Sequence, residues 1–225
     1  MITAVILTLL GVLLAIVVRQ MMKGPGSPQL PGAKTAGAIG APPPSSAAAG
    51  TGDVATDLWN ARAGDVISIS AAAADFSDLD FTVDRRSAYE GANRRWIDLS
   101  GEHRGGRVYL EVYRTPNFEV IGLLDPRKLT LNEVNLTEDR LAELDAKQDP
   151  TQPVDFEGKR WLYESSREIG YFENEQGQGE GLYRWVFRNP NGPELLCIEK
   201  WEGEPFDVRV ARRVNPQDIT VYRAA

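Results

Sequence analysis

The same pattern of strand-forming residues occurs twice in this chain, first between residues 75 and 131 and again between residues 155 and 222. The later blocks match as follows: Arg95-Trp96 with Arg184-Trp185, 110–113 with 198–201, 118–120 with 206–208, and 129–131 with 219–221. Their offsets are 89, 88, 88 and 90 residues, whereas block 81–84 matches 161–164 at an offset of 80. One insertion of about nine residues within 171–181 explains the change, because exposed hairpin loops tolerate insertions. The pattern predicts an internal duplication.

Alternation of apolar and polar residues predicts short β-strands in both copies. The expected strands cover residues 66–69, 81–84, 96–99, 108–113 and 119–123, then 161–164, 182–188, 195–201, 206–210 and 219–222. Turn sequences such as Gly105-Gly106 and residues 189–192 separate the strands. The expected fold is therefore mainly β, an internally duplicated antiparallel β sandwich or barrel, with copies at about 64–131 and 152–222.

One short helix is expected between the two copies. Thr137 is a good N-cap, acidic residues occupy the first turn after it, and Leu136 can pack on Leu141. The Asp149-Pro150 pair stops the helix, since the residue before a proline disfavours helical backbone. The predicted helix covers residues 138–147 and bridges the copies.

Residues 1–18 carry no charge and are almost entirely apolar. As a helix they would span about 27 Å, close to the hydrocarbon thickness of roughly 30 Å. We therefore expect a transmembrane anchor over residues 1–23, a flexible Pro/Gly/Ala/Ser linker over 24–56 and the duplicated β domain over 57–225. Arg19 and Lys23 follow the apolar run, so the positive-inside rule predicts a single-pass protein of the bacterial inner membrane with a cytoplasmic C-terminal domain. A signal anchor of the opposite orientation is the alternative.

The chain beyond residue 52 is strongly acidic, because it holds 22 basic and 32 acidic residues, a net charge of 22 − 32 = −10. Nucleic-acid binding needs a basic surface, so DNA and RNA are disfavoured as partners. Cys197 and His103 are the only residues of their kinds. This inventory excludes an intramolecular disulfide and a Cys-based zinc site, and we expect no metal and no cofactor.

Several motifs are similar to those of a known family: GDVISIS near residue 64, then FTVDRR, RRWIDL and VYLEVYR, and later GKRWLYE, IEKWEGEPF and ARRVNPQDITVY. The chain resembles the bacterial domain-of-unknown-function family DUF4178 over about residues 64–222. The resemblance implies a β-rich fold and a bacterial origin. It implies no catalytic residue, because the family has no assigned activity.

Two acidic residues occupy matching places in the copies, and both lie among aromatic side chains. On a strand, Glu111 shares a face with Tyr113, and Glu199 shares a face with Trp201. If the copies pack about a pseudo-twofold axis, the two carboxylates approach each other. Each is expected to pair with an arginine of a neighbouring strand, Arg95 and Arg184 being the repeated candidates, to bind a ligand or to act in catalysis. The candidate binding residues are Glu111, Tyr113, Glu199, Trp201, Arg95 and Arg184.

Three functions remain open at this point. The favoured interpretation is a membrane-tethered binding or adaptor module that acts through protein contacts on an unknown ligand or partner. The alternative is a carboxylate-dependent hydrolase using Glu111 and Glu199, since a pair of acids is the minimal equipment of a glycosidase-type site. The third is a structural subunit of a membrane complex. The sequence predicts no catalytic residue and does not determine the oligomeric state.

Overall fold

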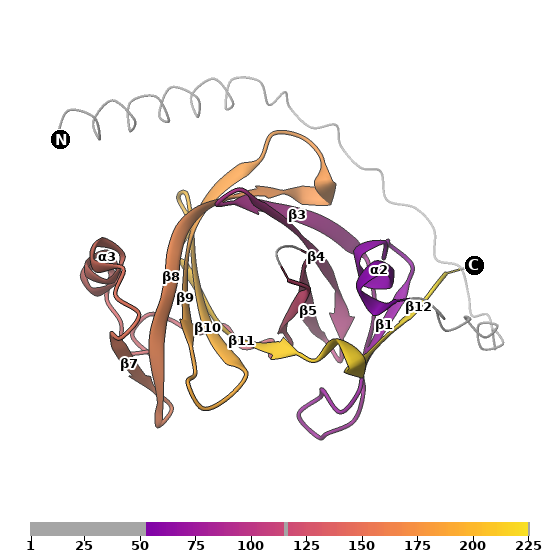
Figure 1. Cartoon of the computed structure of the whole chain (residues 1–225), viewed down its shortest axis with the longest axis horizontal. Coiled ribbons are helices and arrows are strands. Elements are labelled where there is room, and N and C mark those ends of the chain that lie inside the picture. Colours follow the sequence, from indigo (N-terminus) through magenta and orange to yellow (C-terminus); the bar gives the residue numbers. More distant parts are fainter. Residues whose placement is uncertain (1–52, 115–116, 225) are drawn as a thin grey trace, which may run out of the picture. The chain divides into compact units, whose positions relative to one another are not determined.

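Eight antiparallel strands close into a barrel in the computed structural model, which describes residues 53–114 and 117–224 (Figure 1). Around the barrel the strands follow the order β3 (Arg85–Gly91), β4 (Arg94–His103), β5 (Gly106–Tyr113), β6 (Glu119–Leu123), β11 (Phe206–Val214), β10 (Glu194–Trp201), β9 (Glu180–Arg188) and β8 (Lys159–Phe172). Strand β8 pairs with β3, which closes the barrel. Of the two expected architectures, sandwich or barrel, the structure is therefore a barrel, and each of its eight strands pairs with a neighbour on both sides.

The barrel consists of two successive four-stranded meanders, β3 to β6 and β8 to β11. They meet at two seams, β3 against β8 and β6 against β11. At the first seam Tyr89 lies opposite Tyr171, and at the second Val120 lies opposite Val214. Each seam thus joins corresponding strands of the two meanders, first with first and last with last.

The register corrects one expected equivalence between the copies. Trp96 lies opposite Tyr113, and Leu182 lies opposite Trp201. Since Tyr113 and Trp201 correspond, the counterpart of Trp96 is Leu182, and its predicted superposition on Trp185 is wrong. The shift is three residues, 185 − 182, and an odd shift reverses the face of a strand. Accordingly Trp96 packs inside the barrel, whereas Trp185 packs in a cluster outside it.

A small sheet and a short helix cover the outer face of the first meander. They are β12 (Ile219–Tyr222), β1 (Val66–Ile69) and β2 (Leu79–Thr82), in that order, and α2 (Val54–Trp59). Leu99 and Leu110, fully buried on the outer face, pack in one cluster with Ile67 of the small sheet. At the C-terminal end, Arg223 forms ion pairs with Asp57 at 3.1 Å and with Asp65 at 2.9 Å.

The second meander is covered by α3 (Glu138–Lys147) and β7 (Pro153–Phe156), which pairs with β8. The side chain of Thr137 accepts a hydrogen bond from the backbone N–H of Arg140 at 3.2 Å, so it caps the helix as predicted. Leu141 and Leu144 of the helix pack in one cluster with Phe187 of the barrel. Figure 1 shows α3 beside β8 and α2 beside β1.

Most predicted elements are confirmed, but β4 and β8 are much longer than the strands expected over 96–99 and 161–164. The strands over 66–69, 119–123 and 219–222 and the helix over 138–147 have the expected bounds. Strands β3 and β7 and helix α2 were not predicted. The expected anchor over 1–23 and residues 24–52 of the expected linker over 24–56 lie outside the described residues, whereas residues 54–56 of that linker begin α2. In the described part of the chain, no helix has the length and apolar character needed to cross a membrane.

Candidate functional site

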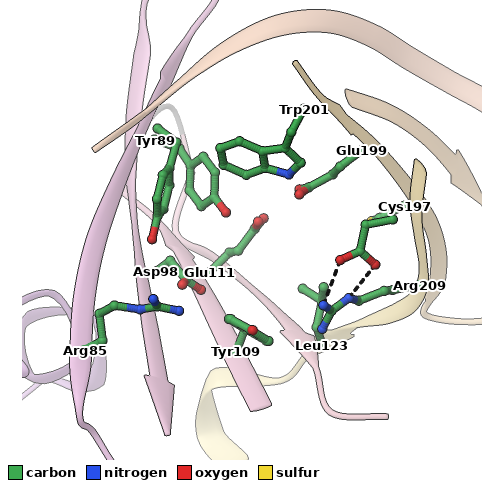
Figure 2. A pocket seen from close by; sticks show the side chains of 12 residues that line it. Arg85, Tyr89, Asp98, Tyr109, Glu111, Leu123, Cys197, Glu199, Trp201 and Arg209 are labelled. Carbon is green, nitrogen blue, oxygen red and sulfur yellow. Dashed lines mark hydrogen bonds and ion pairs between the residues drawn. The ribbon is translucent and has the colours of Figure 1, made fainter. Parts of the chain in front are cut away.

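A cavity of about 160 Å³ lies among the inward-facing side chains of the barrel (Figure 2). Its aromatic lining comprises Tyr89, Tyr109, Tyr171 and Trp201, and its charged lining comprises Arg85, Asp98, Glu111, Glu199, Asp207 and Arg209. Leu123 and Cys197 complete it. These residues come from seven of the eight barrel strands, so closure of the barrel is what forms the cavity.

Arg184 of β9 holds the two repeated glutamates together beside this cavity. Its Nη2 lies 2.8 Å from Oε1 of Glu111 on β5 and 2.5 Å from Oε1 of Glu199 on β10. Its Nε also donates to Glu199 at 2.8 Å, and Nη1 donates to Oε2 of Glu111 at 3.1 Å. Arg184 is 6% exposed and Glu111 is 4% exposed, so this is a buried ion-pair network contributed by both meanders.

Aromatic rings surround the guanidinium of Arg184. Its Cζ lies 4.8 Å from the ring centroid of Tyr89 and 5.8 Å from that of Trp96. Burial opposes the charge on Arg184, but the carboxylates of Glu111 and Glu199 outweigh that cost and raise its pKa well above the usual value. The arginine therefore stays charged and fixes the positions of both glutamates.

Asp98 of β4 faces the same space without such a partner. It is 3% exposed and lies opposite Glu111 on the neighbouring strand. Burial, with the nearby Glu111 carboxylate adding to it, raises the pKa of Asp98 to about 8. No hydrogen bond or ion pair joins its carboxyl to a side chain or backbone group of residues 53–114 and 117–224. Asp98 is therefore a buried acid that is largely protonated at neutral pH.

Arg85 of β3 provides a second unsatisfied group near Asp98 (Figure 2). Its Nη1 pairs with Glu173 at 3.1 Å, but its Nε is buried and lacks a hydrogen-bond acceptor among the described residues. A buried donor without an acceptor costs about 1 to 3 kcal/mol. The two unsatisfied groups, one acid and one N–H donor, therefore belong to the same cavity.

Arg209 and Asp207 of β11 form an ion pair at the cavity wall, and Lys128 lies 3.6 Å from Asp207 as a second cation. Arg209 donates from Nε and Nη2 to the two oxygens of Asp207 at 2.9 and 2.8 Å. The guanidinium of Arg209 lies 5.2 Å from the ring centroid of Tyr109. Burial opposes the charge of Asp207, but Arg209 outweighs it and lowers the pKa of Asp207 below its usual value. Neither charge of this pair is free for another partner.

The structure brings five of the six sequence-predicted site residues together. Besides the Arg184 network, Tyr113 donates its hydroxyl to Oε2 of Glu111 at 2.7 Å, and Trp201 lines the cavity beside Glu199. The sixth residue, Arg95, does not join this site.

Arg95 lies outside the barrel, where it pairs with Glu90 at 2.6 Å and approaches Glu175 at 3.6 Å. The expected pairing of Arg95 with one of the two repeated glutamates is therefore wrong. The reason is the alternation of a strand, since Trp96 points inward and its neighbour Arg95 must point outward. The arginine that binds both glutamates therefore comes from the second meander alone.

The sequence did not predict four charged residues of the cavity, namely Asp98, Arg85, Asp207 and Arg209. A signal for Asp98 existed, because it stands two residues after Trp96 and so shares its face. Arg85 and the strand that carries it had no comparable signal, since residues 85–91 lack a clear alternation of apolar and polar side chains. Within the described ranges there is also no group of three or more His, Cys, Asp or Glu side chains placed to hold a metal ion.

The family model described as Domain of unknown function (DUF4178) matches residues 72–216, which include every strand of the barrel. The chain belongs to this family. No curated protein and no solved structure matches the chain significantly. The interpretation of the cavity therefore rests on its own geometry.

Proposed function

We propose that this domain is a small-molecule-binding module whose ligand occupies the cavity inside the barrel. The observation that carries the proposal is that one cavity is lined by the unsatisfied Arg85 Nε–H and by Asp98, a buried residue whose carboxyl has no hydrogen-bond or ion-pair partner among the described residues. Native proteins satisfy nearly all buried polar groups, so each exception calls for an explanation. A ligand that bonds to both groups removes the cost of leaving them unpaired.

The size of the cavity limits that ligand. A dry cavity of about 150 Å³ accommodates benzene, so a volume of about 160 Å³ suits one ring or an equally small chain. Tyr171 and Trp201 at the cavity are only partly buried, whereas Asp98 and Glu111 are buried. The polar end of a ligand would thus lie deepest, with its apolar part against the aromatic rings. The interior of an eight-stranded barrel is wide enough either to be filled by side chains or to hold one small ligand.

The surrounding ion pairs support a binding role because they hold the walls rigid. Arg184 connects strands β5, β9 and β10, and Arg209 is fixed by Asp207 and by the ring of Tyr109. A preformed pocket loses less conformational entropy when the ligand binds. The few unpaired groups then set the specificity.

The alternative, a hydrolase that uses Glu111 and Glu199, has less support from this geometry. A glycosidase-type pair requires one carboxyl held protonated as the acid while the other is ionised. Here both carboxylates accept hydrogen bonds from the same arginine, so these contacts do not set one of them apart as the acid. The binding module is therefore the better conclusion.

The proposal keeps the expected tether, a single membrane-spanning segment over residues 1–23 that holds the domain on the cytoplasmic face of the bacterial inner membrane. The supporting observations are the uncharged run up to residue 18 and the basic residues that follow it. Digestion of intact spheroplasts by an added protease should leave the domain intact, and removal of the domain would refute this orientation. A protein partner that responds to the ligand-loaded domain also belongs to the proposal.

An internal duplication forms part of the same proposal. It is supported by the two seams, which join corresponding strands of the two meanders, and by the matching places of Glu111 and Glu199. A duplicated barrel has one interior between its halves. The binding site would then have arisen at the contact between the copies.

Saturation-transfer NMR with the full chain and a library of single-ring compounds tests the binding proposal. Leu123→Trp fills the cavity and should abolish saturation transfer to any compound that binds the wild type. Asn191→Trp is the matched control, because it places the same side chain in an exposed turn and should leave binding unchanged. Binding that is equal in the wild type and Leu123→Trp would contradict the proposal.

A further inference from the structure

The geometry points to a ligand with a positively charged amino group beside a hydrogen-bond acceptor oxygen, on an apolar body of about one ring, with Asp98 as its counter-charge. The class of ligand is thus a small aromatic or short-chain amine, best an amino alcohol. This inference rests on the proposed ligand site and adds the chemistry that the site recognises.

The balance of charges around the cavity is the first step. Four acidic residues and three arginines lie at or beside the cavity. The acids are Asp98, Glu111, Glu199 and Asp207, and the arginines are Arg85, Arg184 and Arg209. Each arginine already has an acidic partner: Arg184 pairs with both glutamates, Arg209 with Asp207, and Arg85 with Glu173 at the rim. Asp98 is thus the carboxyl that remains without a cation. A cationic ligand group would supply what these side chains lack.

The groups around Asp98 do not neutralise its carboxylate, so a cationic ligand group can do so. The charged or titratable groups facing it are Arg85 and Tyr89 of β3, Glu111 of β5, Tyr171 of β8, Arg184 of β9 and Glu199 of β10. The arginines in this set are bound to other acids, so their attraction does not offset burial and the repulsion of the glutamates. Consistently, the pKa of Asp98 is raised to about 8, chiefly by burial. An ammonium group at this point would stabilise the ionised carboxyl.

The aromatic wall suits a cation as well. Arg184 already covers the ring of Tyr89, and Arg209 covers that of Tyr109. The rings of Tyr171 and Trp201 meet edge to face, with centroids 5.3 Å apart and planes at 86°, and both line the cavity. Aromatic faces attract ammonium groups and also stack on an apolar ring. This part of the wall can therefore hold either end of such a ligand.

An anionic ligand fits the same cavity poorly. It would gain one hydrogen bond from the Arg85 Nε–H, but it would lie near Glu111, which is opposite Asp98 in the sheet. Like charges at such distances repel strongly inside a protein. The Arg85 Nε–H is better matched by a neutral oxygen, which is why a hydroxyl next to the amino group satisfies both unpaired groups at once.

Four probes of one size and different charge test this inference with the full chain: phenethylamine, phenylglycinol, phenethyl alcohol and phenylacetate. We expect phenylglycinol to bind most tightly, then phenethylamine, with phenethyl alcohol weaker by about tenfold or more and phenylacetate weakest. Because the cation competes with the proton of Asp98, the affinity for phenethylamine should rise about tenfold per pH unit between about pH 6 and about pH 8. NMR titration measures both quantities.

Asp98→Asn should remove this pH dependence and the preference for amines, while the variant remains folded. Glu202→Gln is the matched control, because it neutralises an exposed acid in the turn beside Trp201 and should change neither. Equal or tighter binding of phenethyl alcohol or phenylacetate would overturn the amine assignment and leave the binding module intact. Failure of every probe to distinguish the wild type from Leu123→Trp would overturn both proposals.

Discussion

The outer face of this barrel is apolar and covered, whereas its interior carries charges around a cavity. Outside, Leu99 and Leu110 lie under the small sheet, and Phe187 lies under α3. Inside, Arg184, Asp98 and their neighbours are buried among aromatic rings. Burial of apolar area supplies most of the stability of a domain, and buried charges contribute little to it. The comparison shows how this chain separates the side chains that hold the fold from those that recognise a ligand.

Truncation in an outer core should have the largest effect. Phe187 is fully buried and packs against Tyr163 with their rings edge to face. Phe187→Ala should lower the free energy of unfolding by about 4 kcal/mol, since it leaves a cavity. Urea unfolding measures this change, and the probe preferences of the remaining folded protein should be unaltered. A change in ligand preference without loss of stability would break the separation of outside from inside.

Removal of the interior arginine should have the next largest effect. Arg184→Met leaves the buried Glu111 and the partly buried Glu199 without a counter-charge, and we expect a loss of about 3 kcal/mol at neutral pH. The triple variant Arg184→Met, Glu111→Gln, Glu199→Gln should recover most of that loss, because no unpaired charge remains. If the triple variant is as unstable as the single one, the arginine acts through packing and not through its charge.

The pH dependence of stability should report Asp98. Its folded pKa of about 8 lies above its ordinary value of 3.8, so the folded state keeps a proton that the unfolded state releases. Its contribution to stability is therefore full below about pH 4, falls as the pH rises towards 8 by up to about 1.4 kcal/mol per pH unit, and is constant above that. Asp98→Asn should remove this fall. The test is the urea midpoint of unfolding, measured for both proteins between about pH 4 and about pH 8. If the midpoints of variant and wild type change with pH in parallel, the raised pKa of Asp98 is contradicted.

Replacement of Glu111 should lower the stability more than replacement of Glu199. Glu111 is buried and also accepts the Tyr113 hydroxyl, whereas Glu199 is partly exposed. Since Arg184 keeps one carboxylate in either variant, Glu111→Gln should cost about 2 kcal/mol and Glu199→Gln about 1 kcal/mol, measured by urea unfolding. The reverse order would show that burial does not control the strength of this network.

Replacement of Arg95 should have the smallest effect on stability. Because Arg95 lies outside the barrel, it serves as the comparison for Arg184 inside it. Its side chain is about half exposed, as is that of its partner Glu90. Arg95→Gln should change the free energy of unfolding by less than about 0.5 kcal/mol and leave probe binding unchanged. A loss as large as that of Arg184→Met, measured under the same conditions, would mean that the outer arginine has a structural role that its contacts do not show.

The sequence by itself determined the local elements and half of the site. The helix over 138–147 was predictable because Thr137 caps it through neighbours in the chain. The strand over 119–123 was predictable from local alternation. Glu111 and Glu199 were singled out because they occupy matching places in two similar stretches of sequence, and the structure places both on Arg184.

Only the tertiary structure decided which residues meet inside the barrel. Closure of β3 on β8 distinguishes a barrel from a sandwich, and both use the same alternation within each strand. The register decided that Trp96 corresponds to Leu182, because pairing between neighbouring strands sets it, alternation within one strand does not, and a shift by an odd number reverses the face. The place of Asp98 beside Arg85 follows likewise from the pairing of β4 with β3. Local patterns specify the strands, but the cavity is formed by their arrangement around a closed sheet.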